Sequence, residues 1–449
     1  MKIFNSSMCV NNSIDRQMYY VGIFGLLIIS FFFYFYTLTH PVCCDANEYI
    51  NLANSIHDSG LESFRDQVRT WGYPWLLSIL ISFSKIVHLP FNLIVFFFQI
   101  VFYYFSILFF CKSIASLGIN RNTVSFIYLF LCLNFFAIPY SIVTLTDSVY
   151  LTLSLLFFSQ VFTLFRNDIR DKTNILLWAL FIICCSVAIR PAAIWMTIPY
   201  VYLWLFYFSK GGVNFIKFTA LSVFSSFPIV LQLIINISQF GKYSIFPVID
   251  LGSLQIKWGI EYLKYGTWLG GGPPQNYYPS SALIDNTDSD IGVVWYFYNF
   301  FDGIKLLLFK FVGSFDFDYL VPYAYSKPYI PYIPSFVSFV LLWIGLLTIF
   351  FHLFSNKIPV IGPKLLPFLV LFSWGGVSLL SAIELRFTLP LLMYFIIISP
   401  IFYEFVYSKS SSKMKLFYIL GGMFFVTFCT IVALFVRSQS SILDYVYIQ

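Results

Sequence analysis

The stretch from Tyr19 to Leu38 reads YYVGIFGLLIISFFFYFYTL and contains no charged residue. A helix of about twenty apolar residues is long enough to cross the hydrocarbon core of a bilayer. The stretch Cys44-Asp45-Ala46-Asn47-Glu48-Tyr49 follows a few residues later and brings two carboxylates to the membrane surface. Ionisable groups at that depth are costly and are usually functional. The two stretches together predict a membrane protein with a polar site beside its first span.

The composition of the whole chain agrees with this class. Hydrophobic residues make up 59% of the sequence and charged residues 10%, and the mean hydropathy is +0.82. A soluble domain carries about 25% charged residues, so this chain could not cover itself with a water-facing shell. We therefore expect an all-α polytopic membrane protein. The net charge of +6 comes from lysines and arginines between hydrophobic runs, so membrane lipids are the expected partners and nucleic acid is not.

Apolar runs of spanning length recur along the chain and predict about eleven transmembrane helices. The expected spans are 19–38, 91–111, 122–141, 148–165, 174–189, 191–208, 215–237, 335–354, 364–382, 387–407 and 416–436. The run from Trp75 to Val87 is short and is broken by serines and Lys85. We interpret it as an interfacial or re-entrant helix.

The distribution of positive charge predicts the orientation, because lysine and arginine collect in cytoplasmic loops. With the N-terminus in the cytoplasm, the inside loops carry Lys2, Arg16, Lys112, Arg121, Arg166, Arg170, Lys172, Lys210, Lys217, Lys357, Lys364, Lys409, Lys413 and Lys415. The short outside loops contain only Arg190 and Arg386. If Trp75 to Val87 crossed the membrane, the later loops would change sides and the charge distribution would no longer follow the positive-inside rule. Short loops and the lack of accessory domains favour a bacterial cell (inner) membrane protein.

Two predicted exterior segments are long, and long segments in a compact protein are usually functional or partly disordered. The first is the loop 39–90. The second, 238–334, contains a Gly/Pro-rich stretch and an acidic patch. We therefore divide the chain into a transmembrane module with the first exterior loop (1–237), a large exterior loop region (238–334) and C-terminal transmembrane helices (335–449).

The segment after Asp45 has the pattern of an amphipathic helix in the membrane interface. On a helical reading its polar residues share one face, and these are Glu48, Asn51, Ser55 and Asp58. The opposite face carries Tyr49, Leu52, Ala53 and Ile56. Asp45 followed three residues later by Glu48 also matches a capping box, so the local pattern leaves capping and catalysis open for Asp45.

Three further charged residues fall in short exterior loops. Asp147 precedes the fourth span, where the local pattern is that of a helix N-cap. Arg190 and Arg386 are exceptions to the positive-inside rule, because they are cations in short exterior loops. An arginine at a helix end commonly reaches for lipid headgroups, but its planar fork also matches a phosphate. A zinc site from His40, His57 and Asp45 lacks metal-ligand spacing, so we expect no metal.

Five motifs in order resemble the GT-C superfamily of membrane glycosyltransferases, in the branch of protein O-mannosyltransferases and lipid A aminoarabinose transferases. The pattern D-x-x-x-Y-x-x-x-A occurs at 45–53, and R-x-P-G-Y-P-x-L at 69–76 has Trp71 in place of its first proline. The later motifs are Thr146-Asp147, Arg190-Pro191 and the R-[FY]-x-x-P segment 386–390. The resemblance extends to about Tyr407.

The resemblance implies a conserved seven-helix module with two interfacial helices in the first exterior loop, followed by a variable set of helices. It also implies an inverting transfer of a sugar from a polyprenyl-phosphate donor to a cell-envelope glycan, lipid or protein on the exterior face. Asp45 would be the catalytic base. The substrate-binding residues would be Glu48, Arg69, Tyr73, Asp147, Arg190 and Arg386, with Arg386 preferred for the donor phosphate. Asp45-Ala46-Asn47 is not a DxD pair, so the resemblance implies neither a metal nor another cofactor.

Two other functions fit the same exterior acids and arginines. A flippase or transporter of lipid-linked sugars would use them along a substrate path. An O-antigen-type polymerase also has about eleven spans and a large exterior loop, but usually gathers its arginines in such loops. Because the acid in the first loop dominates here, the sequence favours a glycosyltransferase.

Overall fold

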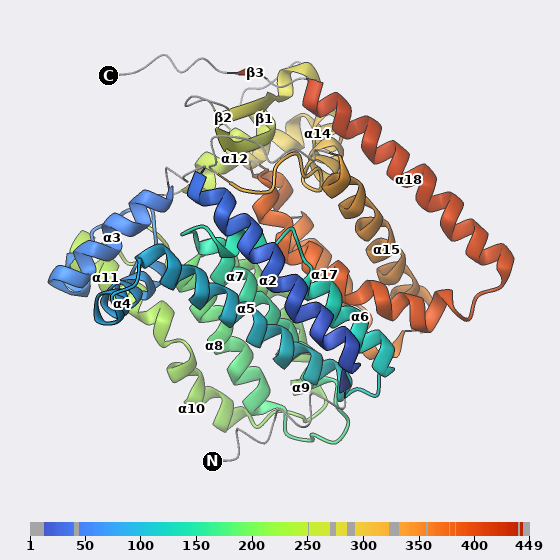
Figure 1. Cartoon of the computed structure of the whole chain (residues 1–449), viewed down its shortest axis with the longest axis horizontal. Helices are drawn as coiled ribbons and strands as arrows, with labels where there is room; N and C mark the ends of the chain where they lie inside the picture. The colour runs from blue at the N-terminus through green and yellow to red at the C-terminus, as the bar shows by residue number, and fades with distance from the viewer. Residues whose placement is uncertain are drawn as a thin grey trace. The chain divides into compact units, whose positions relative to one another are not determined.

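The computed structural model describes residues 13–39, 45–249, 251–269, 275–284, 292–322, 332–355, 358–376, 378–381, 383–438 and 441–442 (Figure 1). These residues form two compact units. Unit 1 comprises Met1–Thr37, Cys43–Ile249 and Ile358–Leu369, and unit 2 comprises Leu38–Val42, Asp250–Lys357 and Val370–Gln449. The large loop region 238–334 thus divides near Ile249, and most of it joins the C-terminal helices in unit 2.

Unit 1 is built from helices. They are α2 (Arg16–Thr39), α3 (Asp45–Ser59), η1 (Leu61–Ser63), α4 (Gly72–Val87), α5 (Phe91–Ala115), α6 (Arg121–Cys132), η2 (Ile138–Ser141), α7 (Thr146–Leu164), α8 (Thr173–Ile189), η3 (Pro191–Met196), α9 (Thr197–Ser209), α10 (Phe215–Ser225), α11 (Phe227–Phe240) and η6 (Pro359–Ile361). The short helix α16 (Leu366–Leu371) begins in this unit.

Helix α7 lies at the centre of unit 1 and packs against α5 and α8 (Figure 1). Nearly all of its side chains are buried, including several serines and threonines. Small hydroxyl residues suit such a helix because they let neighbours approach closely. Some hydroxyls bond within the helix, as Thr152 Oγ1 does to Ser148 O at 3.0 Å, whereas Ser148 Oγ donates to Ser141 Oγ of η2 at 3.2 Å. The first turn of α7, with Asp147, is therefore held rigidly.

The amphipathic helix predicted after Asp45 is present as α3, and its two faces are confirmed. Glu48, Asn51, Ser55 and Asp58 are exposed, while Ala53 and Ile56 are buried. The apolar face packs on α4. Helix α4 contains the run from Trp75 to Val87 and has 16 residues, so it is shorter than the helices long enough to span.

The first loop is anchored to α11 by Trp71, the residue in place of the first proline of the R-x-P-G-Y-P-x-L pattern. The Trp71 amide donates to Gln232 Oε1 at 3.2 Å, and its indole Nε1 donates to Pro228 O at 3.2 Å. Proline has no amide hydrogen and could not make the first bond. Beside it, a Cβ on Gly72 would lie 2.5 Å from Ala188 O on α8. Trp71 and Gly72 therefore hold the start of α4 against two other helices.

Seven helices among the described residues are long and apolar enough to cross a membrane, and an eighth span results if the bent pair α10–α11 crosses as one. The chain is thus a predominantly helical membrane protein, and the count of about eleven spans stays a prediction. The predicted continuous span 122–141 is wrong. Helix α6 ends at Cys132, and Asn134 Oδ1 then accepts from the amides of Phe136 and Ala137, a local bond that competes with the helix.

Unit 2 combines helices with a small sheet. Its helices are α12 (Leu251–Glu261), η4 (Ser280–Ala282), η5 (Gly292–Val294), α13 (Trp295–Tyr298), α14 (Phe300–Gly313), α15 (Ile333–Ser355), η7 (Phe372–Gly376), η8 (Ser378–Leu380), α17 (Leu385–Phe402), η9 (Tyr403–Tyr407) and α18 (Ser412–Ser438). The predicted span 364–382 is broken into α16, η7 and η8. The antiparallel strands β1 (Tyr262–Leu269), β2 (Gln275–Pro279) and β3 (Ser441–Ile442) pair in the order β1-β2-β3. The sheet is an addition to the predicted all-α fold.

Candidate functional site

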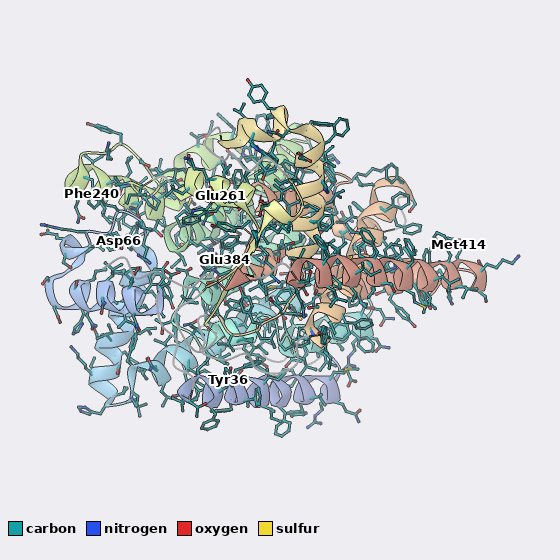
Figure 2. All side chains as sticks on the ribbon, turned by 90° about the horizontal axis from the view of Figure 1, so that it is seen from above. Tyr36, Asp66, Phe240, Glu261, Glu384 and Met414 are labelled. Atoms are coloured by element: carbon teal, nitrogen blue, oxygen red, sulfur yellow. The ribbon has the colours of Figure 1, made fainter. Side chains whose placement is uncertain are left out.

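Asp45 is the first residue of α3 and lies in a cluster of charged side chains in unit 1. Arg69, from the loop before α4, donates from Nη2 to Asp45 Oδ1 at 3.0 Å, and the same nitrogen contacts Glu48 Oε2. Its Nη1 donates to Asp66 Oδ2 at 3.4 Å. Three carboxylates thus surround one guanidinium, and we call Asp45, Glu48, Asp66 and Arg69 the acid cluster. Asp66 is labelled in Figure 2.

The acid cluster is open to the surroundings on the side of α3. The side chains of Asp45 and Glu48 are 33% and 55% exposed, whereas Arg69 and Asp66 are each 15% exposed. Burial alone would lower the pKa of Arg69, but Tyr49, Asp45 and Glu48 outweigh it and raise the pKa above its ordinary value. Arg69 therefore stays charged and holds the carboxylates of Asp45 and Glu48 in place, and it is outnumbered by the three acids of the cluster.

Asp66 is the member that sequence reasoning missed, and it explains why Arg69 is well placed. Its Oδ1 accepts from the amides of Val68 and Arg69 at 2.6 and 2.7 Å. These bonds form a local turn of the kind that aspartate favours. Its Oδ2 contacts the guanidinium. The sequence signal that could have identified Asp66 is its position three residues before Arg69.

A pair of aromatic rings, from the half-buried Tyr49 and the buried Tyr73, lies beside the acid cluster. The Arg69 guanidinium carbon lies 5.2 Å from the centre of the Tyr49 ring, and Tyr49 packs edge-on against Tyr73 with ring centres 5.2 Å apart. Tyr73, a predicted substrate-binding residue, is fully buried. It can therefore support Tyr49 but offers no exposed surface for a ligand.

Tyr73 connects the acid cluster with Asp147. Its pKa is raised, first by burial and then by the neighbouring Tyr49 and Asp147. Gln99 on α5 donates from Nε2 to Tyr73 Oη at 3.5 Å and to Val143 O at 3.4 Å. Gln99 was also missed, although a glutamine inside the apolar span 91–111 is a recognised signal of function. These contacts bring Asp45 and Asp147 into one region of unit 1.

Asp147 forms a buried ion pair with Arg190. Arg190 Nη1 donates to Asp147 Oδ1 at 2.5 Å and to Thr146 Oγ1 at 3.2 Å. The N-cap of α7 is Leu145, so the local prediction that Asp147 caps this helix is wrong. Arg190 is 11% exposed, which excludes the alternative that it reaches out to lipid headgroups. The pair joins the ends of α7 and α8 beside Tyr150, whose ring centre lies 5.8 Å from the guanidinium.

Arg386, the preferred residue for the donor phosphate, belongs to unit 2. It is the second residue of α17, and its Nε contacts Glu384 Oε2. Both side chains are largely buried, at 11% and 10% exposed. Its place in a common site with Asp45 stays a prediction.

A second charged group, also missed, lies in unit 2. Lys264 Nζ donates to Asp318 Oδ1 at 2.8 Å and to Asp316 O at 2.6 Å, and Arg437 donates from Nε to Asp316 Oδ2 at 2.9 Å. We call these four residues the buried network. Asp316-Phe317-Asp318 is a DxD sequence, but its carboxylates contact lysine and arginine. The network ties β1 to α18.

No group of three or more histidine, cysteine, aspartate or glutamate side chains suited to a metal ion occurs in the part of the chain that the structure describes. His40 lies outside that part, and His57 contacts Ser82 and Lys85. Comparison with protein-family models, characterised proteins and solved structures gave no match for this chain. The functional conclusion therefore rests on the geometry of the acid cluster and its neighbours.

Proposed function

We propose that the protein is an integral-membrane glycosyltransferase that moves a sugar from a polyprenyl-phosphate donor to a hydroxyl group of a cell-envelope glycan, lipid or protein. The observation that carries the proposal is the half-buried, accessible carboxylate of Asp45, which Arg69 holds at 3.0 Å at the start of an amphipathic helix. A carboxylate that is oriented yet accessible suits a general base. The resemblance to GT-C enzymes supports the same residue.

In the proposed reaction Asp45 accepts the proton of the acceptor hydroxyl while that oxygen attacks the anomeric carbon of the sugar. A new glycosidic bond forms, and the bond from the anomeric carbon to the phosphate oxygen breaks. Attack from the side opposite the phosphate inverts the anomeric centre. The polyprenyl phosphate leaves with the bonding electrons, so the developing negative charge needs cations nearby.

The arginines divide into two roles under this proposal. Arg69 contacts three carboxylates, which suits it to orienting Asp45 and Glu48 more than to binding a phosphate. Arg190 and Arg386 each contact one carboxylate in the contacts described above. A guanidinium has five donors, and under this proposal one of these two arginines donates to the phosphate. Asp147 then acts by positioning Arg190.

The experiment that tests the proposal is an assay in detergent solution with the purified protein, a polyprenyl-phosphate sugar and an acceptor extract. A transferase releases polyprenyl phosphate and glycosylated acceptor, both of which mass spectrometry detects. A flippase moves lipid between the two leaflets of a bilayer, which detergent micelles lack, and it releases neither product. Mass spectrometry of the envelope glycans and lipids from a deletion strain identifies the sugar, as one missing residue with its lipid-linked donor accumulating. An unchanged glycan profile and no turnover in detergent would refute the proposal.

A further inference from the structure

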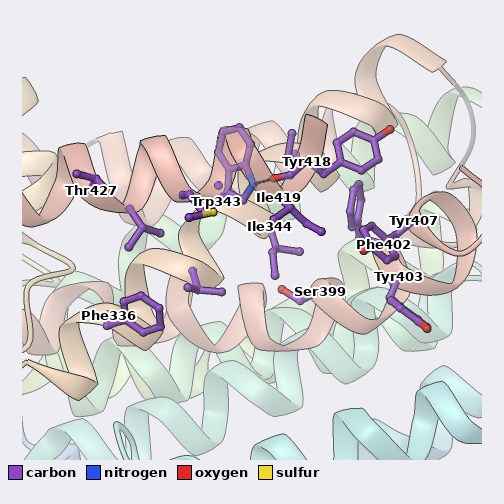
Figure 3. A pocket seen from close by; sticks show the side chains of 15 residues that line it. Phe336, Trp343, Ile344, Ser399, Phe402, Tyr403, Tyr407, Tyr418, Ile419 and Thr427 are labelled. Carbon is purple, nitrogen blue, oxygen red and sulfur yellow. Dashed lines mark hydrogen bonds between the residues drawn. The ribbon is translucent and has the colours of Figure 1, made fainter. Parts of the chain in front are cut away.

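An apolar groove with a volume of about 590 Å³ runs along unit 2 among α15, α17, η9 and α18 (Figure 3). Its size is that of a site for a small organic ligand or a lipid chain. Its floor consists of buried side chains, including Ser399, Phe402, Tyr418 and Val426. Its rim is exposed, with Phe336, Tyr403, Ile419 and Met423. The groove therefore opens on the surface of helices that are long and apolar enough to span a membrane.

The wall formed by Trp343 is fixed in place. Its indole Nε1 donates to Tyr418 O at 3.2 Å, the bond drawn in Figure 3. The ring lies against two glycines of α18, where a Cβ would come within 3.0 Å of it at Gly421 and within 2.9 Å at Gly422. The two helices approach closely at this point because the glycines have no side chain. The groove is thus built by specific packing and does not depend on one loose side chain.

One end of the groove carries positive charge. Tyr407 and Tyr418 line that end. Lys409 follows η9, and Lys413 and Lys415 are in the first turn of α18. Lys415 Nζ lies 5.6 Å from the centre of the Tyr407 ring. Lys409 and Lys413 are exposed. The acid nearest in sequence is Glu404, so lysines outnumber acids at this end, next to an apolar channel.

This end lies far along α17 from the arginine considered for the donor phosphate. Arg386 is in the first turn of α17, and the groove residues Phe402 and Tyr403 follow at its other end. A helix rises 1.5 Å per residue, so roughly 25 Å separates the two ends. The lysines therefore mark a second place for an anionic group, apart from the proposed transfer chemistry.

The charge decides which occupant fits. Inside a bilayer an apolar groove alone selects no lipid, because the surrounding hydrocarbon is equally apolar. Lysines at a membrane surface select anionic headgroups, by roughly fivefold per lysine when its ~1 kcal/mol is converted to affinity. We propose that the groove holds one acyl chain of an anionic phospholipid whose phosphate contacts Lys409, Lys413 and Lys415. Met414, labelled in Figure 2 at the end of α18, lies between two of these lysines in sequence. The proposal does not depend on the proposed glycosyltransferase activity.

The test uses the full chain in phosphatidylcholine nanodiscs that contain either phosphatidylglycerol or phosphatidylcholine with a photoactivatable diazirine in one acyl chain. Peptide mapping after illumination locates the labels. We expect the phosphatidylglycerol probe to label α15 and α18 at the groove at least tenfold more than the phosphatidylcholine probe. The triple variant Lys409→Gln, Lys413→Gln, Lys415→Gln should remove that preference. The matched control, Lys112→Gln, Lys210→Gln, Lys217→Gln, removes the same charge from unit 1 and should keep it.

A second variant tests the groove itself. Val340→Phe with Thr427→Phe adds bulk to two lining positions that are not fully buried, and should lower labelling by the anionic probe several-fold. Thermal unfolding in detergent shows whether this double variant folds. If it does not fold, the triple lysine variant alone tests the proposal. Equal labelling by both probes would overturn the proposal. So would competition by farnesyl phosphate at lower concentration than by phosphatidylglycerol, which would indicate that the groove holds the polyprenyl carrier.

Discussion

The acid cluster of unit 1 and the buried network of unit 2 use the same residue types in opposite ways. In the acid cluster three carboxylates contact one arginine, and two of them face outward. In the buried network two carboxylates meet two cations, and Lys264 and Asp316 are fully enclosed. Balanced, enclosed charges fix a structure, whereas oriented charges that face outward in excess remain able to react. The difference explains why Asp45 is the candidate base and the DxD pair at Asp316 and Asp318 is not.

The largest effect should come from Asp45→Asn. Asparagine keeps the shape of the side chain and caps a helix about as well as aspartate, but it cannot accept the proton. Transfer should fall by about 10²- to 10⁴-fold, measured as product formed by the purified protein. Unfolding temperature should stay near wild type. Asp58→Asn, on the exposed face of the same helix, is the matched control and should keep activity. Substantial turnover by Asp45→Asn would mean that Asp45 only supports the first turn of α3.

The buried network should respond in stability. Lys264→Met leaves Asp316 and Asp318 short of a cation inside the protein, and breaking a buried pair in this way costs about 3–5 kcal/mol. Thermal unfolding in detergent should report the loss. Lys305→Met replaces an exposed lysine of the same unit and should change little. Equal unfolding temperatures for the two variants would contradict an enclosed, structural network.

The same network predicts the response to acid. Burial by itself would raise the pKa of Asp316, but Lys264 and Arg437 outweigh it and lower the pKa to about 2. A carboxyl whose pKa is lower when folded stabilises the fold above its unfolded pKa of about 4. That stability should therefore be lost as the pH falls from about 4 toward 2. Arg437→Gln should narrow this window in an unfolding series against pH, and an unaltered acid profile would argue against the pairing.

A smaller effect is expected at Arg386. If it binds the donor phosphate, Arg386→Ala should weaken affinity for the polyprenyl-phosphate carrier by about tenfold or more, since a hydrogen bond to a charged group contributes about 1.5–3 kcal/mol. Arg386→Lys should weaken it less, because lysine keeps the charge without the fork. Glu384→Gln removes the negative charge beside Arg386 and leaves the arginine, so it should not weaken binding of the carrier. Unchanged affinity in both Arg386 variants would assign the phosphate to Arg190.

The smallest effect should come from Asp66→Asn, which sharpens the role given to Arg69. The asparagine oxygen can still accept from the amides of Val68 and Arg69, so the turn remains, and only one charge facing the guanidinium is lost. Asp45 and Glu48 still contact the guanidinium and hold it in place, so transfer should fall only a few-fold. A loss as large as that of Asp45→Asn would mean that Asp66 itself takes part in the chemistry.

Several features could be predicted from the sequence because they depend on local composition. Hydropathy determines that the chain is a membrane protein, and helical periodicity places Glu48, Asn51, Ser55 and Asp58 on the exposed face of α3. Asp45, Glu48 and Arg69 were identified as candidate site residues from their order along the chain. Local breaks were harder: Asn134 ends α6 through bonds to its own neighbours, a competition that an apolar run conceals.

The pairing of charges was decided only by the tertiary structure. Arg190 and Asp147 are 43 residues apart and Arg437 and Asp316 are 121 apart, and no periodicity connects residues so distant. The pairing decided which residues face outward and which are enclosed. Trp71 shows the same limit: as a sequence it is a departure from a motif, and in the fold it joins the first loop to α11. Hydropathy and periodicity act over a few turns of one helix, whereas the enclosure of a charge depends on which helices pack around it.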